Sequence, residues 1–262
     1  MPDSDGLAGG HLTKALSSPR AALVTGASRR IGRAIAIDLA AHGWRVGIHY
    51  GSQAAEAEAV RTEIEALGGE AAVLGADLTH PQSALDLVAS CQSAIGPLTC
   101  LVNNASMFVE DDIRTLDPAT WDRQFAVNLR APILLAKAFA VSLPQDSTGN
   151  IINIIDQRVL APGADFLSYS LSKSGLFAAT HMLAQALAPR IRVNGIGPGP
   201  VLPSVYQTPR AFADEVGTTL LGRSVAPEEI AATVRFILDA PSLTGQMIAL
   251  DAGQHLARRP PA

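Results

Sequence analysis

The sequence predicts a single-domain α/β fold with a doubly wound sheet of about seven parallel strands, and three observations carry this prediction. Short runs rich in β-branched and apolar residues alternate with helical stretches along the chain. A glycine-containing turn, Thr25 to Gly32, joins the first run to a helical pattern that opens near Ile31. Polar residues follow several runs, at the edge where open α/β sheets bind ligands. With 262 residues and 48% apolar content, the chain can bury such a core.

The expected elements follow in chain order. Residues 1–19 are polar and lack the basic-then-apolar order of a signal peptide, so we expect a flexible N-terminal tail. Residues 20–256 are expected to form the folded domain, and 257–262 a C-terminal tail. The expected strands are residues 21–24, 45–50, 71–76, 100–105, 150–156, 191–196 and 246–251. The prolines from Pro198 to Pro203 predict a substrate loop before a helical segment at 205–222.

Composition excludes several classes of protein. The formal charge is −4 and no stripe of Lys and Arg is present, which argues against nucleic-acid binding. No apolar run reaches the length needed to span a bilayer. Cys91 and Cys100 lack metal-like spacing and fit buried, reduced thiols. We therefore expect a small-molecule partner, no nucleic acid, no membrane and a cytoplasmic location.

A tyrosine and a lysine four residues apart, Tyr169 and Lys173, are the strongest chemical signal. Residues four apart share one face of a helix, so the Lys173 ammonium can approach the Tyr169 phenol and a bound ribose. A phenol has a reference pKa near 10, and a nearby cation favours the phenolate. The pair therefore predicts a proton donor whose pKa is lowered by Lys173, an effect that a carboxylate near Tyr169, such as Asp156, would oppose.

The turn from Thr25 to Gly32 predicts a dinucleotide site. Its glycines precede a helix, where N–H groups can bind a pyrophosphate. Gly26 and Gly32 could instead serve only a tight turn and close helix packing. Arg29 and Arg30 could be surface charges, but a helix N-terminus disfavours cations unless an anion binds there too.

Together these residues resemble the short-chain dehydrogenase/reductase family over roughly 21–255 and, within it, the pteridine reductases. Two departures from the broad family are shared with the pteridine reductases: Arg30 stands where a glycine is usual, and Asp156 stands where a catalytic serine is usual. Phe108 follows Asn104-Ala105 as in that subfamily. The residues that carry the resemblance are Thr25-Gly26…Gly32, Asp77, Asn103-Asn104-Ala105, Asn128, Tyr169-x-x-x-Lys173, Pro198-Gly199 and Asp251-Ala-Gly253.

The resemblance implies a Rossmann-like fold, a homotetramer with interfaces near residues 120–141 and 170–188, and the site residues. The implied catalytic residues are Asp156, Tyr169, Lys173 and Asn128. The implied cofactor-binding residues are Gly26, Ser28, Arg29, Arg30, Ile31, Gly32, Tyr50, Ser52, Asp77, Leu78, Asn104, Ala105, Ser106, Tyr169, Lys173, Pro198 and Gly199. The implied substrate-binding residues are Ser106, Phe108, Asp156 and Tyr169.

The end of the second expected strand favours NADPH as the cofactor. Enzymes that use NAD commonly place an acid there to bind the ribose 2′-hydroxyl, and such an acid would repel a 2′-phosphate. The stretch from Ile48 to Gln53 contains no acid, Ser52 can donate a hydrogen bond, and Arg30 can supply charge.

Asp156 and Phe108 favour a pterin as the substrate. An ionised carboxylate cannot donate to a ketone oxygen, but it can accept from the amine and ring nitrogens of a pterin. An aromatic ring at position 108 could stack on a flat heterocycle. Asp156 could instead cap a turn, and Phe108 could belong to the core. The alternatives are an NADPH-dependent carbonyl or 3-oxoacyl reductase, and a catalytically silent nucleotide-binding protein.

Overall fold

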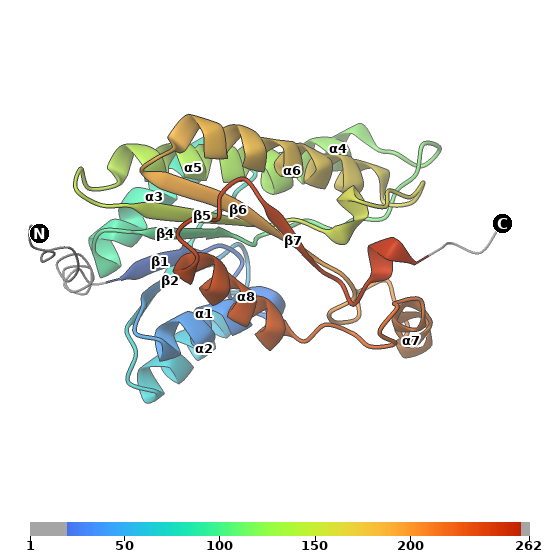
Figure 1. Ribbon diagram of the computed structural model, residues 1–262, viewed down its shortest axis with the longest axis horizontal. Coiled ribbons are helices and arrows are strands. Elements are labelled where there is room, and N and C mark those ends of the chain that lie inside the picture. Colours follow the sequence, from blue (N-terminus) through green and yellow to red (C-terminus); the bar gives the residue numbers. More distant parts are fainter. Residues whose placement is uncertain (1–19, 258–262) are drawn as a thin grey trace, which may run out of the picture.

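A computed structural model describes residues 20–257 as seven parallel strands in the order β3-β2-β1-β4-β5-β6-β7 (Figure 1). The tail expected at residues 1–19, and all but the first residue of the tail expected at 257–262, lie outside the described residues. The strands are β1 (Ala21–Val24), β2 (Arg45–Tyr50), β3 (Ala71–Gly75), β4 (Cys100–Asn103), β5 (Gly149–Ile154), β6 (Ile191–Pro198) and β7 (Met247–Leu250). The predicted sheet is confirmed.

The strand ends differ slightly from the sequence prediction. β1 and β2 have the predicted bounds, but β3, β4 and β5 end one or two residues earlier than expected, while β6 extends to Pro198. The chain leaves the sheet early at β4 and β5, so that Asn104, Ala105 and Asp156 lie in loops beyond the carboxyl edge. Apolar periodicity cannot locate these ends, because the loop residues after each strand are also partly buried.

Two layers of helices cover the sheet. One core contains β1 and β2 side chains with those of α1, α2 and α8, and the other contains side chains of α3, α5 and α6 on the opposite face (Figure 1). Because helices cover both faces, all four residues of β1 are buried. The α-helices are α1 (Arg30–Ala41), α2 (Ala54–Ala66), α3 (Pro81–Ile95), α4 (Pro118–Phe125), α5 (Ala131–Ser142), α6 (Leu167–Leu187), α7 (Pro209–Gly217) and α8 (Pro227–Asp239).

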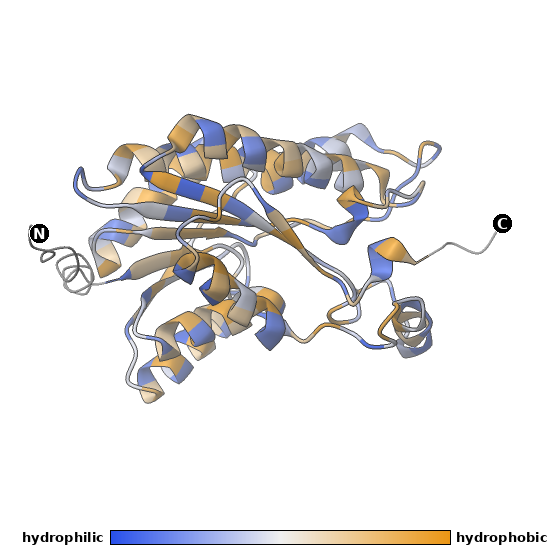
Figure 2. Ribbon diagram, in the orientation of Figure 1, coloured by the Kyte–Doolittle hydropathy of each residue, from blue (hydrophilic) through white to orange (hydrophobic). Residues whose placement is uncertain are grey.

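Hydropathy varies within each layer. Figure 2 shows hydrophobic and hydrophilic residues alternating along β6, and both kinds on the helices that cover the sheet. The helix expected at 205–222 is shorter, since only α7 is helical there, and it has no buried residue. Cys91 and Cys100 are free and buried, and burial raises the pKa of each thiol to about 12. Thiols of this kind are unreactive core groups.

One helical stretch corrects the expectation that no apolar segment reaches spanning length. α4 and α5 are joined by the π-helical turn η1 (Ala126–Arg130), and the continuous stretch Pro118–Ser142 is long and apolar enough, by length and composition alone, to cross a membrane. Arg130 and Lys137 interrupt the apolar run in the sequence, which hid the length of the helix. In the fold, Leu135, Ala136 and Phe139 of this stretch are buried in the core against α3 and the sheet.

Candidate active site

Tyr169 and Asp156 are hydrogen-bonded to each other. Tyr169 lies in the first turn of α6, and its hydroxyl donates to Asp156 Oδ2 at 2.7 Å. The other carboxylate oxygen, Oδ1, accepts from the Arg158 backbone N–H at 2.8 Å and caps the 3₁₀ turn η2 (Gln157–Val159). The capping role and the contact with Tyr169 therefore coexist, because each uses a different oxygen.

Lys173 is buried one turn further along α6. Only 2% of its surface is exposed, and its ammonium donates to the Ile154 carbonyl at the end of β5, 2.8 Å away. Its Nζ lies 5.8 Å from the centre of the Tyr169 ring. The predicted common face of Tyr169 and Lys173 is therefore present. Burial lowers the pKa of Lys173 to about 8, although the charge of Asp156 opposes this.

The expected lowering of the Tyr169 pKa by Lys173 is wrong for this structure. Burial raises the pKa of Tyr169 well above its usual value, and the charge and hydrogen bond of Asp156 raise it further. Burial also raises the pKa of Asp156, against the opposing effects of Arg158, Tyr169 and Lys173. Burial and a carboxylate 2.7 Å from the phenol oxygen both disfavour the phenolate, while the Lys173 ammonium donates to the Ile154 carbonyl and not to the phenol. The phenol therefore keeps its proton and shares it with a carboxyl group of raised proton affinity.

Asn128 connects the loop after β4 to α6. It lies in η1 and is completely buried. Its Oδ1 accepts from the Met107 N–H at 2.8 Å and from the Ser106 hydroxyl at 3.1 Å. Its Nδ2 donates to the Met107 carbonyl at 2.9 Å and to the Ser172 hydroxyl at 3.0 Å. Through these bonds the Asn128 side chain joins Ser106 and Met107 to Ser172 of α6.

The glycine turn fits a dinucleotide diphosphate. Gly26 has a φ of +63°, in the left-handed region that favours glycine. A Cβ on Gly32 would lie 2.3 Å from the Gly26 carbonyl oxygen, so only glycine allows α1 to approach the turn. No side chain caps the N-terminus of α1, and its first turn contains no acid. An anion can therefore reach the N–H groups at this end of the helix.

One further segment borders the glycine turn, and another predicted cofactor residue lies after β6. Asn104 Nδ2 donates to the Thr25 and Gly26 carbonyls at 2.8 and 3.0 Å, and the Ala105 N–H donates to the Thr25 hydroxyl at 3.0 Å. Gly199, after β6, lies against Asp251, since a Cβ there would be 2.7 Å from the Asp251 Cα. The structure thus places Asn104 and Ala105 directly beside the predicted dinucleotide turn.

The remaining predicted cofactor residues lie around this edge. Tyr50 ends β2 and pairs with Gly75 of β3, and Ser52 is exposed in the following loop. The Asp77 carboxylate accepts from the Thr79 N–H and hydroxyl at 2.9 and 2.7 Å, which lowers its pKa, while Leu78 is buried beside it. Of the glycine-turn residues, Ser28 is buried, Arg29 is exposed, and Ile31 packs against the α1 core.

Arg30 makes a contact that the sequence did not predict. Its guanidinium donates to the Leu202 and Pro203 carbonyls at 2.9 and 2.8 Å, in the loop before α7. Burial, and next the charge of Arg29, lower the pKa of Arg30. An anion beside the two arginines would relieve this repulsion. Arg30 therefore links the dinucleotide turn to the predicted substrate loop.

His49 holds the glycine turn in place, and the sequence reasoning missed this residue. It lies in β2 with 2% of its surface exposed, and its Nδ1 accepts from the Gly26 N–H at 3.1 Å. Its Nε2 therefore carries the proton and donates to the Ala76 carbonyl at 3.0 Å. Burial lowers the pKa of His49, which keeps the imidazole neutral. A histidine inside the apolar run Val46–Tyr50 was the available signal.

Phe108 lies among aromatic rings rather than in the core. Its ring stacks on Phe166 at a centroid distance of 4.3 Å and an interplanar angle of 11°. The Tyr169 ring meets it edge-on, with centroids 4.7 Å apart, and the Tyr206 ring lies 6.3 Å away. Phe108 is half-buried and belongs to neither hydrophobic core. The structure thus places an aromatic surface beside the phenol and carboxyl groups.

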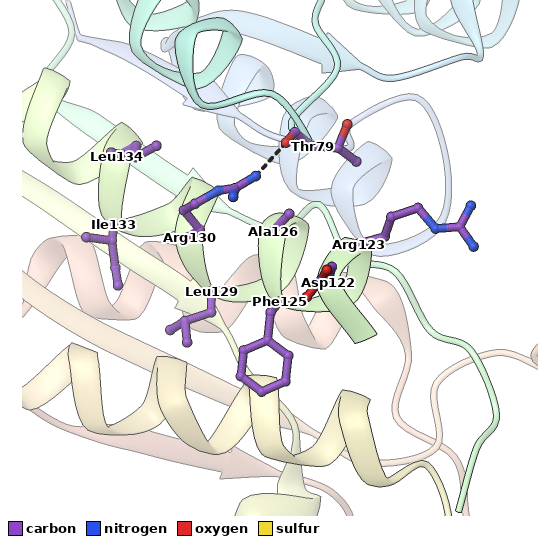
Figure 3. A pocket seen from close by; sticks show the side chains of 9 residues that line it. All are labelled: Thr79, Asp122, Arg123, Phe125, Ala126, Leu129, Arg130, Ile133 and Leu134. Carbon is purple, nitrogen blue, oxygen red and sulfur yellow. Dashed lines mark hydrogen bonds between the residues drawn. The ribbon is translucent and has the colours of Figure 1, made fainter. Parts of the chain in front are cut away.

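An open hollow of about 620 Å³ lies elsewhere, on the α4–η1–α5 stretch (Figure 3). Phe125, Leu129 and Ile133 point to one side of this helix, while Arg130 donates to the Thr79 carbonyl. The lining residues are Thr79, Asp122, Arg123, Phe125, Ala126, Leu129, Arg130, Ile133 and Leu134. None of them is a predicted catalytic or cofactor residue, so the chemistry of Tyr169 gives this hollow no role.

Comparison with known proteins agrees with this geometry. Residues 20–212 match the family model of the short chain dehydrogenases. The 3-oxoacyl-[acyl-carrier-protein] reductase of Synechocystis is 32% identical over 88% of this chain and 95% of its own length. The crystal structure of FolM alternative dihydrofolate reductase 1 from Brucella suis, in complex with NADP, is 50% identical, with a TM-score of 0.90 over 92% of this chain and 97% of that chain. The angucycline C-6 ketoreductase LanV with bound NADP is 31% identical, with a TM-score of 0.84 over 90% of this chain and 96% of its own.

Proposed function

The chain belongs to the short-chain dehydrogenase family and is an NAD(P)-dependent oxidoreductase, and on this premise we propose that it reduces dihydropterins, dihydrofolate among them, with NADPH. The observation that carries the proposal is the hydrogen bond from Tyr169 to Asp156. The solved structure of the Brucella suis protein, 50% identical to this chain, is of an alternative dihydrofolate reductase with NADP, which supports the same substrate class.

The proton chemistry follows from the Tyr169–Asp156 pair. When bound, the nicotinamide supplies a hydride to a ring carbon of the substrate, and the adjacent ring nitrogen then needs a proton. Tyr169 holds a proton that it shares with Asp156, and both groups have raised pKa values. A proton held by this pair can move to the ring nitrogen through the Tyr169 hydroxyl. Lys173, buried as a cation beside them, balances the negative charge that remains on the pair.

Asp156 also favours a pterin over a ketone. A ketone oxygen needs a donor, which an ionised carboxylate cannot supply. The amine and N–H groups of a pterin supply donors that a carboxylate accepts. Phe108 provides an aromatic surface 4.7 Å from the Tyr169 ring, centre to centre, and offset stacking on a flat heterocycle contributes roughly 0.5–1.5 kcal/mol.

A second candidate function is a carbonyl or 3-oxoacyl reductase. The relative from Synechocystis, at 32% identity, supports it. An assay of NADPH oxidation with dihydrobiopterin, dihydromonapterin, dihydrofolate, simple ketones and an acyl thioester separates the candidates. We expect the dihydropterins to give the highest kcat/KM. Faster turnover of the ketones or the thioester would assign the second function, and no turnover with any substrate would favour a silent nucleotide-binding protein.

NADPH should be preferred over NADH by about tenfold or more. The β2 end contains no acid to repel a 2′-phosphate, and one charged hydrogen bond to that group contributes about 1.5–3 kcal/mol. Measuring kcat/KM with each cofactor tests this, and equal values would contradict it. Arg30→Gln adds a control. If Arg30 binds the 2′-phosphate, the variant loses the preference for NADPH. If Arg30 only links the turn to Leu202 and Pro203, kcat/KM falls by the same factor with NADPH and with NADH.

The proposal includes a homotetramer, which the family resemblance supports. Apolar side chains are exposed on the helices expected to form the interfaces, namely Ile133 and Val141 of α5 and Leu171 and Met182 of α6. The hollow in Figure 3 lies on the same surface as Ile133. Association of copies would cover these side chains and stabilise the assembly. Sedimentation equilibrium should give four times the mass of the chain, and a monomer at micromolar concentration would contradict the proposal.

A further inference from the structure

The loop that carries Phe108 is bound by two buried carboxamides that lie one helical turn apart. Gln124 and Asn128 belong to the continuous helix Pro118–Ser142, and both are completely buried. The Val109 N–H donates to Gln124 Oε1 at 3.2 Å, and Gln124 Nε2 lies 3.4 Å from the Val109 carbonyl. Asn128 binds the N–H and carbonyl of Met107 in the same way. The two residues that flank Phe108 are thus held by the same kind of contact.

This pattern of contacts resembles the pairing of a β-strand edge. In an extended chain, the N–H and C=O groups of alternate residues face one side, and those of the residue between them face the other. Here Met107 and Val109 face the helix and use both backbone groups, so side-chain amides take the place of a neighbouring strand. Phe108, the residue between them, is thereby fixed in direction.

The same carboxamides reach α6 on both sides of Tyr169. Gln124 Nε2 donates to the Ser168 hydroxyl, and Asn128 Nδ2 donates to the Ser172 hydroxyl. Ser168 and Ser172 are four residues apart, as are Gln124 and Asn128, so the two hydrogen bonds join the same two helices one turn apart.

A third anchor lies two residues beyond Val109. Asp111 is 5% exposed, and its Oδ1 accepts from the Ser168 N–H at 3.0 Å, in the first turn of α6. The Ser168 hydroxyl donates to the other carboxylate oxygen of Asp111. A carboxylate at this end of a helix is favoured by the helix dipole. The Phe108 loop is therefore held at every second residue, at Met107 and Val109 by the two carboxamides and at Asp111 directly by the first turn of α6.

We propose that Gln124 is a positioning residue for the reaction, which sets the place of the Phe108 ring relative to the Tyr169 hydroxyl and thereby the binding of a flat heteroaromatic substrate. This inference rests on the proposed pterin reduction. Gln124 touches neither the proton donor nor Asp156 directly, and it acts through Val109 and Ser168. Nothing in the chemistry of hydride or proton transfer requires a carboxamide there. Gln124 contributes to the reaction by holding the Phe108 loop in place.

The test is Gln124→Met, which keeps the length of the side chain and removes both kinds of hydrogen bond. We expect KM for the best dihydropterin to rise about five- to tenfold, as expected for losing one or two modest hydrogen bonds, while kcat changes less than twofold. In a Phe108→Ala background the same substitution should leave KM unchanged within twofold, because there is no ring left to position. An equal rise in both backgrounds would overturn the proposal.

Hydrogen exchange gives a readout that needs no substrate. Gln124→Met should speed exchange of the backbone N–H groups of residues 107–111, with the Val109 N–H the most affected. Unchanged exchange of these N–H groups overturns the proposal that Gln124 holds the Phe108 loop through Val109 and Ser168, a set of contacts that we call the clamp. Failure of every dihydropterin in the activity panel overturns only the substrate class. Gln92→Met is the matched control: Gln92 is a half-buried glutamine of α3 whose amide lies 3.4 Å from the Ser142 carbonyl. It should change neither KM nor this exchange.

If Gln124→Met does not fold, Gln124→Asn keeps the amide but shortens its reach. It should raise KM and speed exchange at Val109 in the same direction. Normal KM and normal exchange in Gln124→Asn would overturn the proposal, because the shorter amide cannot make the contacts with both Val109 and Ser168 that define the clamp.

Discussion

Replacing Tyr169 with Phe should lower kcat about 10²- to 10⁴-fold, the range typical of a lost general acid. The substitution removes the hydroxyl that donates to Asp156 and keeps the ring that packs edge-on against Phe108. The fold and the cofactor site should survive, because neither the glycine turn nor the Lys173 contact with Ile154 involves the phenol oxygen.

The measurement is kcat with the best dihydropterin, together with the dissociation constant for NADP⁺ and the melting temperature. A near-normal kcat in Tyr169→Phe would show that another group donates the proton. Ser170→Ala, next to Tyr169 on α6, serves as the control for a small change in the same buried turn, and it should keep kcat within a fewfold of the native enzyme.

Replacing Asp156 with Ser should lower kcat/KM for the dihydropterin at least about tenfold, which corresponds to ~1.4 kcal/mol of transition-state stabilisation. The serine removes the carboxylate that shares the Tyr169 proton and restores the hydroxyl that a ketone substrate would use. Activity toward an activated ketone should rise relative to pterin activity. An unchanged rate with the dihydropterin would show that Asp156 serves only to cap the 3₁₀ turn.

The pH profile gives the second readout for Asp156. Burial raises the pKa of this carboxyl group, and reduction uses the protonated Tyr169–Asp156 pair, so kcat/KM should be highest on the acidic side and fall as pH rises through the pKa of the pair. Serine and asparagine do not ionise at this position. In Asp156→Ser and Asp156→Asn, kcat/KM should therefore no longer fall over this range of pH. A further loss above about pH 8, where Lys173 gives up its proton, should also occur in both variants but begin at lower pH, because the charge of Asp156 no longer raises the pKa of Lys173. A profile identical to that of the native enzyme would contradict the shared proton.

The sequence by itself determined the features that depend on local pattern. Alternating β-rich and helical runs gave the seven parallel strands, because a strand buried on both faces reads as a continuous apolar run such as Ala21–Val24. The spacing of Tyr169 and Lys173 placed both on one face of α6, because the helical repeat alone fixes that relation. Gly26 and Gly32 were recognisable because only glycine allows a left-handed φ or so close a backbone approach.

Tertiary structure decided what depends on two distant segments. The bond between Asp156 and Tyr169, the stack of Phe108 on Phe166, the contact of His49 with Gly26 and the clamp of Gln124 on Val109 join residues between 13 and 58 positions apart. The direction of the Tyr169 pKa belongs to this group too, since burial raises this pKa and the contact with Asp156 raises it further, and both depend on how distant elements pack around α6. Local periodicity fixes which way a side chain leaves its own element. It cannot fix which group of another element it meets, because that depends on how whole elements pack against one another.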